Sequence, residues 1–242
     1  MTTTLQTATH AERVDALPWD DLRAALDDRG FAVTAPLLAP DECADLSGLF
    51  EDGRFRSTID MARHRFGEGR YRYFEHPLPE PIAALRAAFY RRLAPIANDW
   101  SALLGGSPDA FPGEHAELLE RCRAAGQERP TPLILRYGPG DWNALHQDLY
   151  GDVFFPFQVL TVLSEPGEDH EGGEFVLVES RRRAQSRAHV VPARQGAFVI
   201  FPTRERPAAG RRGHHRAGMR HGVSTVTAGR RTALGIIFHD AR

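Results

Sequence analysis

The sequence predicts an α+β fold in which N-terminal helices brace an antiparallel β-sandwich or barrel. Before residue 130, apolar residues recur mostly at helical spacing. After residue 130, short runs rich in Val, Ile and Phe are separated by Gly, Pro and acidic residues, a pattern typical of strands joined by turns. Many short strands of this kind indicate a sandwich or barrel, and the jelly roll is one such fold.

The bulk composition fits one domain of ordinary globular type. The chain has 242 residues, of which 42% are hydrophobic and 26% are charged. The net charge of −2 indicates no particular partner, and all 30 basic residues are arginine. The N-terminus has no signal-peptide pattern, and the longest mostly apolar run, Val153 to Leu163, is too short to cross a membrane. We therefore expect a cytoplasmic protein with no membrane partner.

The change of pattern near residue 130 divides the chain. We expect a flexible tail over residues 1–17 and a single domain over residues 18–242. Within that domain, residues 18–129 form a helix-rich support and residues 130–242 form the jelly-roll core.

The first half carries four helix signals and one strand signal. Pro95 predicts a break or kink in the longest helix, because proline removes an internal hydrogen bond. The segment over residues 53–79 has no clear period. The predicted elements are a helix over Asp20–Arg29, a strand over Phe31–Leu38, a helix from Asp41, a long helix over Pro81–Leu104 and a helix over Glu114–Ala124.

The second half carries seven strand signals. Each is a short run rich in β-branched or aromatic residues and bounded by turn residues. They are Leu133–Tyr137, Val153–Leu163, Glu174–Val178, His189–Val191, Ala197–Phe201, Gly222–Val226 and Thr232–His239.

Three residues form a candidate iron site. His146 and Asp148 are separated by one residue, so at the end of a strand both side chains face the same side. Fe(II) accepts two histidines and one carboxylate on one face and keeps three positions open. His221 is the best second histidine, because a strand, a Gly turn and another strand follow it. A hairpin of that kind would place His221 near the metal with a basic group opposite.

Arg231, ten residues after His221, is the candidate basic group. Strand alternation places Arg231, Ala233 and Gly235 on one face and Arg230 on the other. A buried arginine can hold a carboxylate through paired hydrogen bonds. The histidine–carboxylate pair alone is a weak signal, and the joint pattern of all four residues makes it specific.

These residues carry a resemblance to the 2-oxoglutarate/Fe(II) dioxygenase superfamily, which has a double-stranded β-helix (jelly-roll, cupin-like) core. HGVSTVTAGRR is similar to the second half of prolyl-hydroxylase-like domains, and RYGPGDWNALHQD resembles AlkB-type nucleic acid demethylases. The run from HQDLYGDVFF to ESRRRAQSR, with RHGVSTV and LGIIFHDA, resembles a bacterial family labelled as oxygenases for oxidative demethylation of damaged DNA.

The resemblance implies an enzyme that uses Fe(II), 2-oxoglutarate and O2. By carry-over, His146, Asp148 and His221 hold the iron, Arg231 binds the distal carboxylate of 2-oxoglutarate, and Tyr137 assists. Leu135 stands where AlkB-type enzymes have an asparagine, so that contact is absent.

Two segments are candidates for substrate contact. Residues 181–220 hold eleven arginines and one acidic residue, Glu205, which suits a polyanion or an ordinary solvated loop equally. Around Arg70, Tyr71 and Tyr73, basic and aromatic residues alternate as they do in proteins that stack on bases. We take Arg70, Tyr71, Tyr73 and Arg216 as the candidate substrate residues.

Three functions remain open on the sequence alone. The first is oxidative demethylation of alkylated DNA or RNA bases, a role in DNA repair. The second is hydroxylation of a protein side chain or small metabolite. The third is a non-catalytic jelly-roll binding protein, against which the complete set of four site residues argues.

Overall fold

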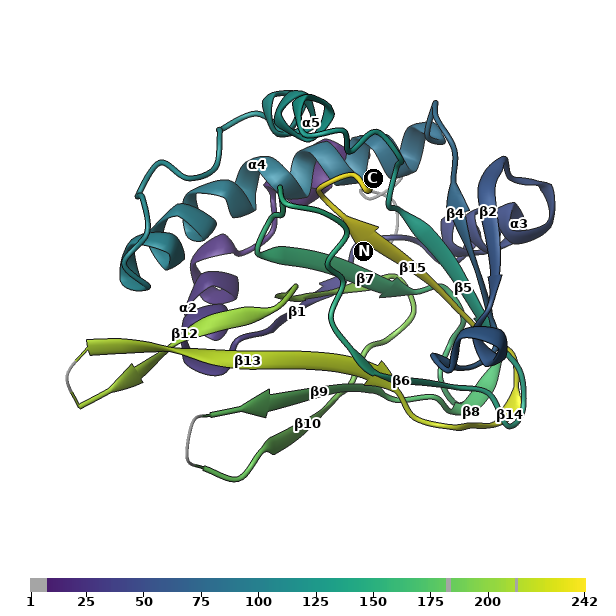
Figure 1. Ribbon diagram of the computed structural model, residues 1–242. Helices are drawn as coiled ribbons and strands as arrows, with labels where there is room; N and C mark the ends of the chain where they lie inside the picture. The colour runs from purple at the N-terminus through teal and green to yellow at the C-terminus, as the bar shows by residue number, and fades with distance from the viewer. Residues whose placement is uncertain (1–7, 182–183, 212) are drawn as a thin grey trace.

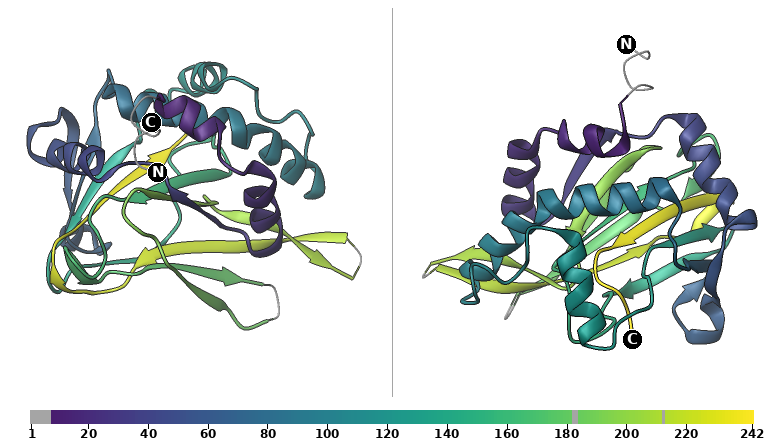
Figure 2. Two further views of the ribbon diagram at one scale, coloured as in Figure 1. Left: turned by 180° about the vertical axis from the view of Figure 1, so that it is seen from behind. Right: turned by 90° about the horizontal axis from the view of Figure 1, so that it is seen from above.

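The computed structural model describes residues 8–242 apart from 182–183 and 212. Two antiparallel sheets lie face to face, and the helices cover the outer face of one of them (Figure 1). Figure 2 shows the same layers from behind and from above. The observed fold is thus a jelly-roll core braced by helices on one side, as the sequence predicts.

The larger sheet has seven strands, and each described pair in it is antiparallel. β15 is its central strand, between β7 and β5. In spatial order the strands are β1 (Ala32–Pro36), β11 (Ala197–Pro202), β7 (Phe157–Val162), β15 (Arg231–Ile237), β5 (Leu133–Tyr137), β4 (Arg70–Phe74) and β2 (Phe55–Asp60).

The smaller sheet has six strands, and none of the helices in the described part of the chain covers its outer face (Figure 1). Its spatial order is β10 (Arg187–Val191), β9 (Phe175–Ser180), β13 (Gly213–Val223), β6 (Trp142–His146) and β3 (Gly67–Glu68), with β12 (Glu205–Gly210) paired to the outer part of β13. A separate pair, β8 (His170–Gly172) and β14 (Val226–Gly229), closes one end.

Five α-helices and one short 3-10 helix complete the described chain. They are α1 (His10–Asp15), α2 (Trp19–Arg29), α3 (Pro40–Asp52), η1 (Met61–His64), α4 (Glu80–Leu103) and α5 (His115–Ala124). No helix among the described residues combines the length and hydropathy that a membrane span requires.

Successive residues of a strand point to opposite faces of the sheet, so the larger sheet contributes to two hydrophobic cores. Ile134 on β5 and Leu234 on β15 point toward the helices, and both belong to the core beneath α4. Their neighbours Leu133, Leu135 and Ala233 point between the sheets into the second core. The space between the sheets therefore receives every second residue of β5 and β15, and the site lies there.

Three expectations differ from the observed elements. The expected flexible tail includes helix α1, because Thr9 and Glu12 form a capping box and Val14 is fully buried in the core; residues 1–7 lie outside the described residues. Sequence analysis predicts a break or kink at Pro95, but helix α4 continues through this residue, which lies on its exposed side, so the helix does not break there. Residues 53–79, which show no period, supply β2, η1, β3 and β4.

Candidate active site

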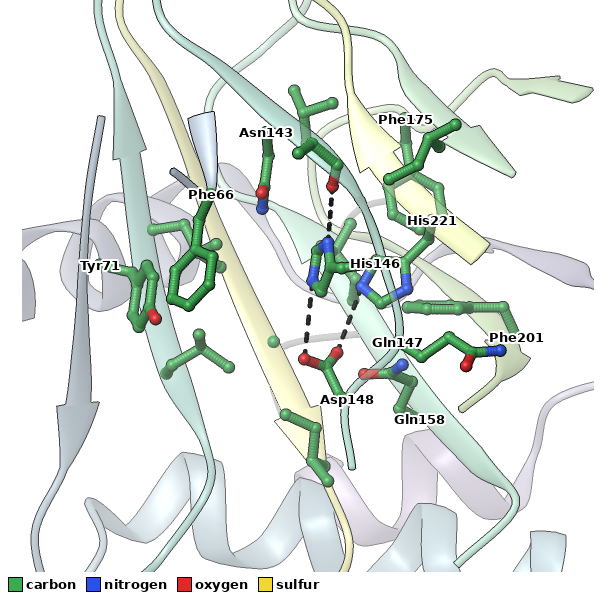
Figure 3. Close-up of a pocket in the computed structure, with 18 of the residues that line it drawn as sticks. Phe66, Tyr71, Asn143, His146, Gln147, Asp148, Gln158, Phe175, Phe201 and His221 are labelled. Carbon is green, nitrogen blue, oxygen red and sulfur yellow. Dashed lines mark hydrogen bonds and ion pairs between the residues drawn. The ribbon is translucent and has the colours of Figure 1, made fainter. Parts of the chain in front are cut away.

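Three side chains, from β6, from the turn that follows it and from β13, meet between the sheets (Figure 3). His146 is the last residue of β6, and His221 lies directly opposite on β13. Asp148 follows β6 by two residues and turns its carboxylate back toward both rings. The Nε2 atoms lie 3.6 Å (His146) and 3.2 Å (His221) from the Asp148 carboxylate oxygens. One ligand atom from each residue lies within 4.8 Å of the others, as a shared metal ion requires.

Hydrogen bonds from other residues orient this triad. Nδ1 of His146 lies 2.8 Å from the carbonyl oxygen of Ala144, so it can donate its proton there and leave Nε2 free as a ligand. Tyr150 donates a 2.7 Å hydrogen bond to Oδ1 of Asp148, and Tyr73 donates a 2.9 Å bond to the Tyr150 hydroxyl. Hydrogen bonds within the protein therefore orient His146 and Asp148.

The protonation states also suit a metal. Burial acts to raise the pKa of Asp148, but the hydrogen bonds from His221 and Tyr150, together with the charge that either histidine carries when it is protonated, outweigh burial and hold that pKa below its usual range. Burial lowers the pKa of His221, which favours the neutral ring. Metal ions bind carboxylate and neutral imidazole, so both shifts favour coordination.

Gln147 fixes the turn between the two ligands. Its side-chain amide donates hydrogen bonds to the carbonyl oxygens of Arg204 at 2.7 Å and Met219 at 2.8 Å. These carbonyls belong to the neighbouring β12–β13 region. The middle residue of His146-Gln147-Asp148 thus ties the ligand turn to the sheet that carries His221.

Arg231 faces the same cavity from the other sheet. It is the first residue of β15, opposite Tyr137 on β5, and only 1% of it is exposed. All three guanidinium nitrogens lack a hydrogen-bond partner among the described residues. Burial lowers the pKa of Arg231, so a carboxylate at this point would restore stability to its charged form.

Tyr137 lies beside that guanidinium. It is fully buried, and the centre of its ring is 5.6 Å from the Arg231 Cζ atom. Burial raises the pKa of Tyr137 to about 12, so the hydroxyl stays protonated. Asn143 donates a 3.3 Å hydrogen bond to the Tyr137 hydroxyl.

One cavity of about 330 Å³ joins these two groups. Its wall contains all three triad residues together with Arg231 and Tyr137. Figure 3 shows Phe66 and Tyr71 on the same side of this cavity, facing His146. Phe66 and Leu145 line the cavity and are 48% and 46% exposed, so they mark its mouth. The enclosed space has a metal-binding wall, a cationic wall and an apolar, partly aromatic entrance.

The structure brings together some of the four candidate substrate residues. Tyr71 and Tyr73 line the cavity. Arg70 is exposed on β4 and does not line it, and Arg216 lies on β13, where it forms an ion pair with Glu205. The alternating segment therefore divides, with its tyrosines inside and its first arginine outside.

The remaining histidines fit structural roles. His239 is fully buried, and its Nδ1 accepts a 3.2 Å hydrogen bond from the backbone N–H of Phe155. Asp240 pairs with buried Arg86 at 2.7 Å. His214 and His215 are exposed on β13. Among the residues described, only the predicted triad forms a cluster that could hold a metal.

Sequence reasoning missed Asn143 and Tyr150. Simple alternation places Asn143 and His146 on opposite faces of a strand. In the structure His146 pairs with His221 and Asn143 pairs with Val223, so β6 contains one extra residue. This bulge brings both side chains into the cavity. The hairpin expected after His221 is also wrong, because β13 and β15 lie in different sheets, which is why Arg231 faces the metal ligands across the cavity.

Comparisons with known proteins agree with this arrangement. Residues 69–241 match the family described as an oxygenase catalysing oxidative methylation of damaged DNA. The uncharacterized proteins MT2286 and Rv2227 of Mycobacterium tuberculosis are each 49% identical to this chain over 190 residues, 78% of either chain.

Solved structures share the fold. A Pseudomonas putida prolyl-4-hydroxylase is 16% identical with a TM-score of 0.53, over 93% of this chain and 99% of that one. A 2OG-Fe(II) family oxidoreductase from Burkholderia pseudomallei is 18% identical with a TM-score of 0.51, over 92% of both chains.

Proposed function

The chain belongs to the family of oxygenases described as catalysing oxidative methylation of damaged DNA, and we propose that it demethylates alkylated nucleic acid bases as an Fe(II)- and 2-oxoglutarate-dependent dioxygenase. Oxidation of a methyl C–H bond can remove a methyl group from nitrogen but cannot add one, so the proposed reaction is demethylation. The observation that carries the proposal is a two-histidine, one-carboxylate cluster sharing a cavity with an unpartnered buried arginine.

The residues present fit both groups. The donor set of two imidazoles and one carboxylate is the set that non-haem Fe(II) oxygenases use. Three unpartnered guanidinium nitrogens at Arg231 need an acceptor with more than one oxygen, and a carboxylate provides it. A diacid with a chelating end and a free carboxylate, such as 2-oxoglutarate, matches the two walls of the cavity.

When bound, Fe(II) with 2-oxoglutarate and O2 supplies the oxidising power that places one oxygen atom in a substrate C–H bond and the other in succinate, with loss of CO2. His146, Asp148 and His221 would hold the iron, with Tyr150 fixing the Asp148 carboxylate. Arg231 would bind the distal carboxylate of the cosubstrate, and Tyr137 would assist as a hydrogen-bond donor.

The buried wall excludes water from the reacting groups. Phe175, Phe201 and Leu160 line the cavity and are nearly inaccessible to solvent. Low polarity around the site strengthens the ionic contact between Arg231 and a bound carboxylate.

Aromatic and basic groups at the entrance support a nucleobase substrate. Phe66 and Tyr71 offer ring faces. Arg65 also lines the cavity and adds a positive charge. A planar base can stack on such rings regardless of its sequence context. Hydroxylation of an N-methyl group there gives an unstable N-hydroxymethyl group, which breaks its C–N bond to release formaldehyde and the free base.

The decisive experiment offers the Fe(II)-loaded enzyme a methylated single-stranded oligonucleotide and measures formaldehyde and succinate. We expect equal amounts of both, none of either from His221→Ala, and normal amounts from His189→Ala, whose ring lies on β10 outside the cavity. Succinate without formaldehyde from any methylated strand, together with turnover of a peptide or metabolite, would replace this proposal with the hydroxylase alternative.

The expected cellular location and biological role belong to the same proposal. A cytoplasmic location and a role in DNA repair fit a substrate of this class. A non-catalytic binding protein fits neither the family nor the complete set of site residues.

A further inference from the structure

Strands β12 and β13 form a two-stranded arm that projects from the body of the molecule. We use "the arm" for residues 204–220, of which the structure describes all but residue 212. Figure 1 shows it extending beyond the helices, and Figure 2 shows the same projection from above. The two strands pair from Glu205↔Gly218 to Gly210↔Gly213. Sequence analysis predicts no strand in this segment and leaves open a polyanion-binding surface or an ordinary solvated loop.

The arm is strongly basic. Its sequence contains six arginines, two histidines and one acidic residue, Glu205. Arg204, Arg211, Arg216 and Arg220 are exposed, as are both histidines. Glu205 forms an ion pair with Arg216 and lies 3.8 Å from Arg204, so one carboxylate faces two guanidinium groups. The surface keeps a net positive charge although the whole chain has a net charge of −2.

One arginine of the arm has a structural role. Arg206 is buried and donates a 2.8 Å hydrogen bond to the buried carboxylate of Glu179 on β9. It also passes close to Gly30, where any β-carbon would lie 2.4 Å from the Arg206 Cδ atom. Arg206 therefore anchors the base of the arm. Of the exposed arginines, Arg216 also has contacts within the protein, with Glu205 and with the Leu104 carbonyl oxygen at 3.3 Å, but its side chain stays open to solvent.

The base of the arm adjoins the mouth of the metal cavity. Gln147, which lines that cavity, donates hydrogen bonds to the carbonyl oxygens of Arg204 and Met219. Farther along β13, His221 supplies a metal ligand, while Gly213 lies eight residues away at the tip. At about 3.3 Å per residue, the tip lies roughly 26 Å from that ligand.

From this arrangement we propose that the arm binds the phosphate backbone of a nucleic acid strand whose base enters the metal cavity. The inference rests on the proposed function and names the surface that function would use. Stacked nucleotides repeat every 3.4 Å along one strand, so the arm would accompany about eight nucleotides on one side of the reacting base. Exposed arginines at intervals along that length would neutralise phosphates without reading sequence.

The test compares two triple variants by strand binding at several salt concentrations. The arm variant carries Arg204→Gln, Arg211→Gln and Arg216→Gln. The matched control carries Arg91→Gln, Arg121→Gln and Arg123→Gln on the helix layer, where these side chains are exposed. The probe is a fluorescent 20-nucleotide strand with one central methylated base, in DNA and RNA forms.

We expect the arm variant to bind at least tenfold more weakly at 50 mM salt. The slope of log K against the logarithm of the salt concentration should become shallower by about 2. Each lost phosphate contact contributes about 0.7 to that slope for a single strand, and the variant removes three arginines. The control should match the wild type within twofold. Replacing the same three arm arginines by Lys should keep affinity within about threefold, which separates charge from loss of folding.

Strand length gives a second readout. For the wild type, KM should fall as nucleotides are added on one side of the methylated base and level off near eight. In the arm variant this gain should disappear while kcat stays within twofold.

Three outcomes would overturn the inference. One is an arm variant whose affinity and salt dependence equal those of the wild type. Another is equal weakening by the helix-layer control. The third is displacement of the strand by polyglutamate at equal charge concentration, which would assign the arm to acidic polypeptides. Failure of the wild type to release formaldehyde from any methylated strand would instead contradict the proposed function, since strand binding is measured without turnover.

Discussion

The two walls of the cavity are prepared for their ligands in different ways. On the β6–β13 wall, hydrogen bonds orient the proposed metal ligands: the Ala144 carbonyl oxygen lies at Nδ1 of His146, and the Tyr150 hydroxyl donates to Asp148. On the β15 wall, Arg231 is more deeply buried, and its guanidinium has no hydrogen-bond partner among the described residues. Hydrogen bonds within the protein orient the side chains of the first wall, whereas the buried guanidinium of the second wall needs a ligand to satisfy it.

This difference has an energetic meaning. Orienting a ligand in advance lowers the cost of binding, because the protein does not reorganise when the ion arrives. An unpartnered buried cation does the opposite and lowers the stability of the ligand-free protein. A change on the first wall should therefore reduce function without raising stability. A change at Arg231 should reduce function and raise the stability of the ligand-free protein.

The largest effect is expected from removing a metal ligand. Asp148→Ala and His221→Ala should each abolish metal-dependent succinate formation. The cluster offers three ligands, and each change leaves only two to hold the iron. Metal content by elemental analysis checks the cause, and His214→Ala on the arm serves as the histidine control for metal content. Wild-type metal content in His221→Ala would remove that residue from the ligand set.

The second prediction concerns the unpartnered wall. Arg231→Met should raise the KM for 2-oxoglutarate about a hundredfold, since a charged hydrogen-bonded pair contributes about 1.5–3 kcal/mol. The same change should raise the thermal midpoint of the ligand-free protein. A gain of about 1 kcal/mol corresponds to about 2–4 °C in a chain of this size.

Arg230→Met is the matched control for that prediction. Arg230 is adjacent but exposed, as strand alternation predicts, so both KM and midpoint should stay unchanged. A ligand-free Arg231→Met protein that melts below the wild type would show that Arg231 stabilises the fold directly.

Much of this could be read from the sequence. The triad, Arg231 and Tyr137 carry chemistry-specific residue types at informative spacings, and strand alternation correctly separates Arg231 from Arg230. Asn143 could not be read in this way, because a bulge in β6 breaks the alternation. The β12–β13 arm was missed because its Gly, Pro, Arg and His residues have low strand propensity. Its strands form by pairing with each other and, at the base of the arm, by the pairing of Gly218–Arg220 with β9.

The third prediction tests the orientation of Asp148. Tyr150→Phe removes the hydrogen bond to Oδ1 and should weaken metal affinity about tenfold, the usual scale for loss of a ligand-orienting partner. Metal affinity is measured by titration with a competing chelator. Tyr90→Phe is the control, because the Tyr90 hydroxyl bonds to the carbonyl of Pro112 far from the site. Equal affinities in Tyr150→Phe and the wild type would mean that the hydrogen bond does not orient the carboxylate.

The smallest effect is expected at Tyr137. Tyr137→Phe keeps the buried ring but loses the hydroxyl next to Arg231, and should raise the KM for 2-oxoglutarate about fivefold, on the scale of one neutral hydrogen bond. Steady-state kinetics check it, with kcat expected within twofold. A KM as high as that of Arg231→Met would mean that Tyr137, rather than the arginine, is the main anchor.

The most direct test of the account is an anaerobic titration of the Fe(II)-loaded protein with 2-oxoglutarate, followed by visible absorption. Chelation of iron by the keto acid gives a charge-transfer band, and we predict that it saturates at one equivalent in the wild type. It should be absent in His221→Ala and should need far more 2-oxoglutarate in Arg231→Met. No band in the wild type, or an unchanged titration in both variants, would contradict a shared metal and cosubstrate site in this cavity.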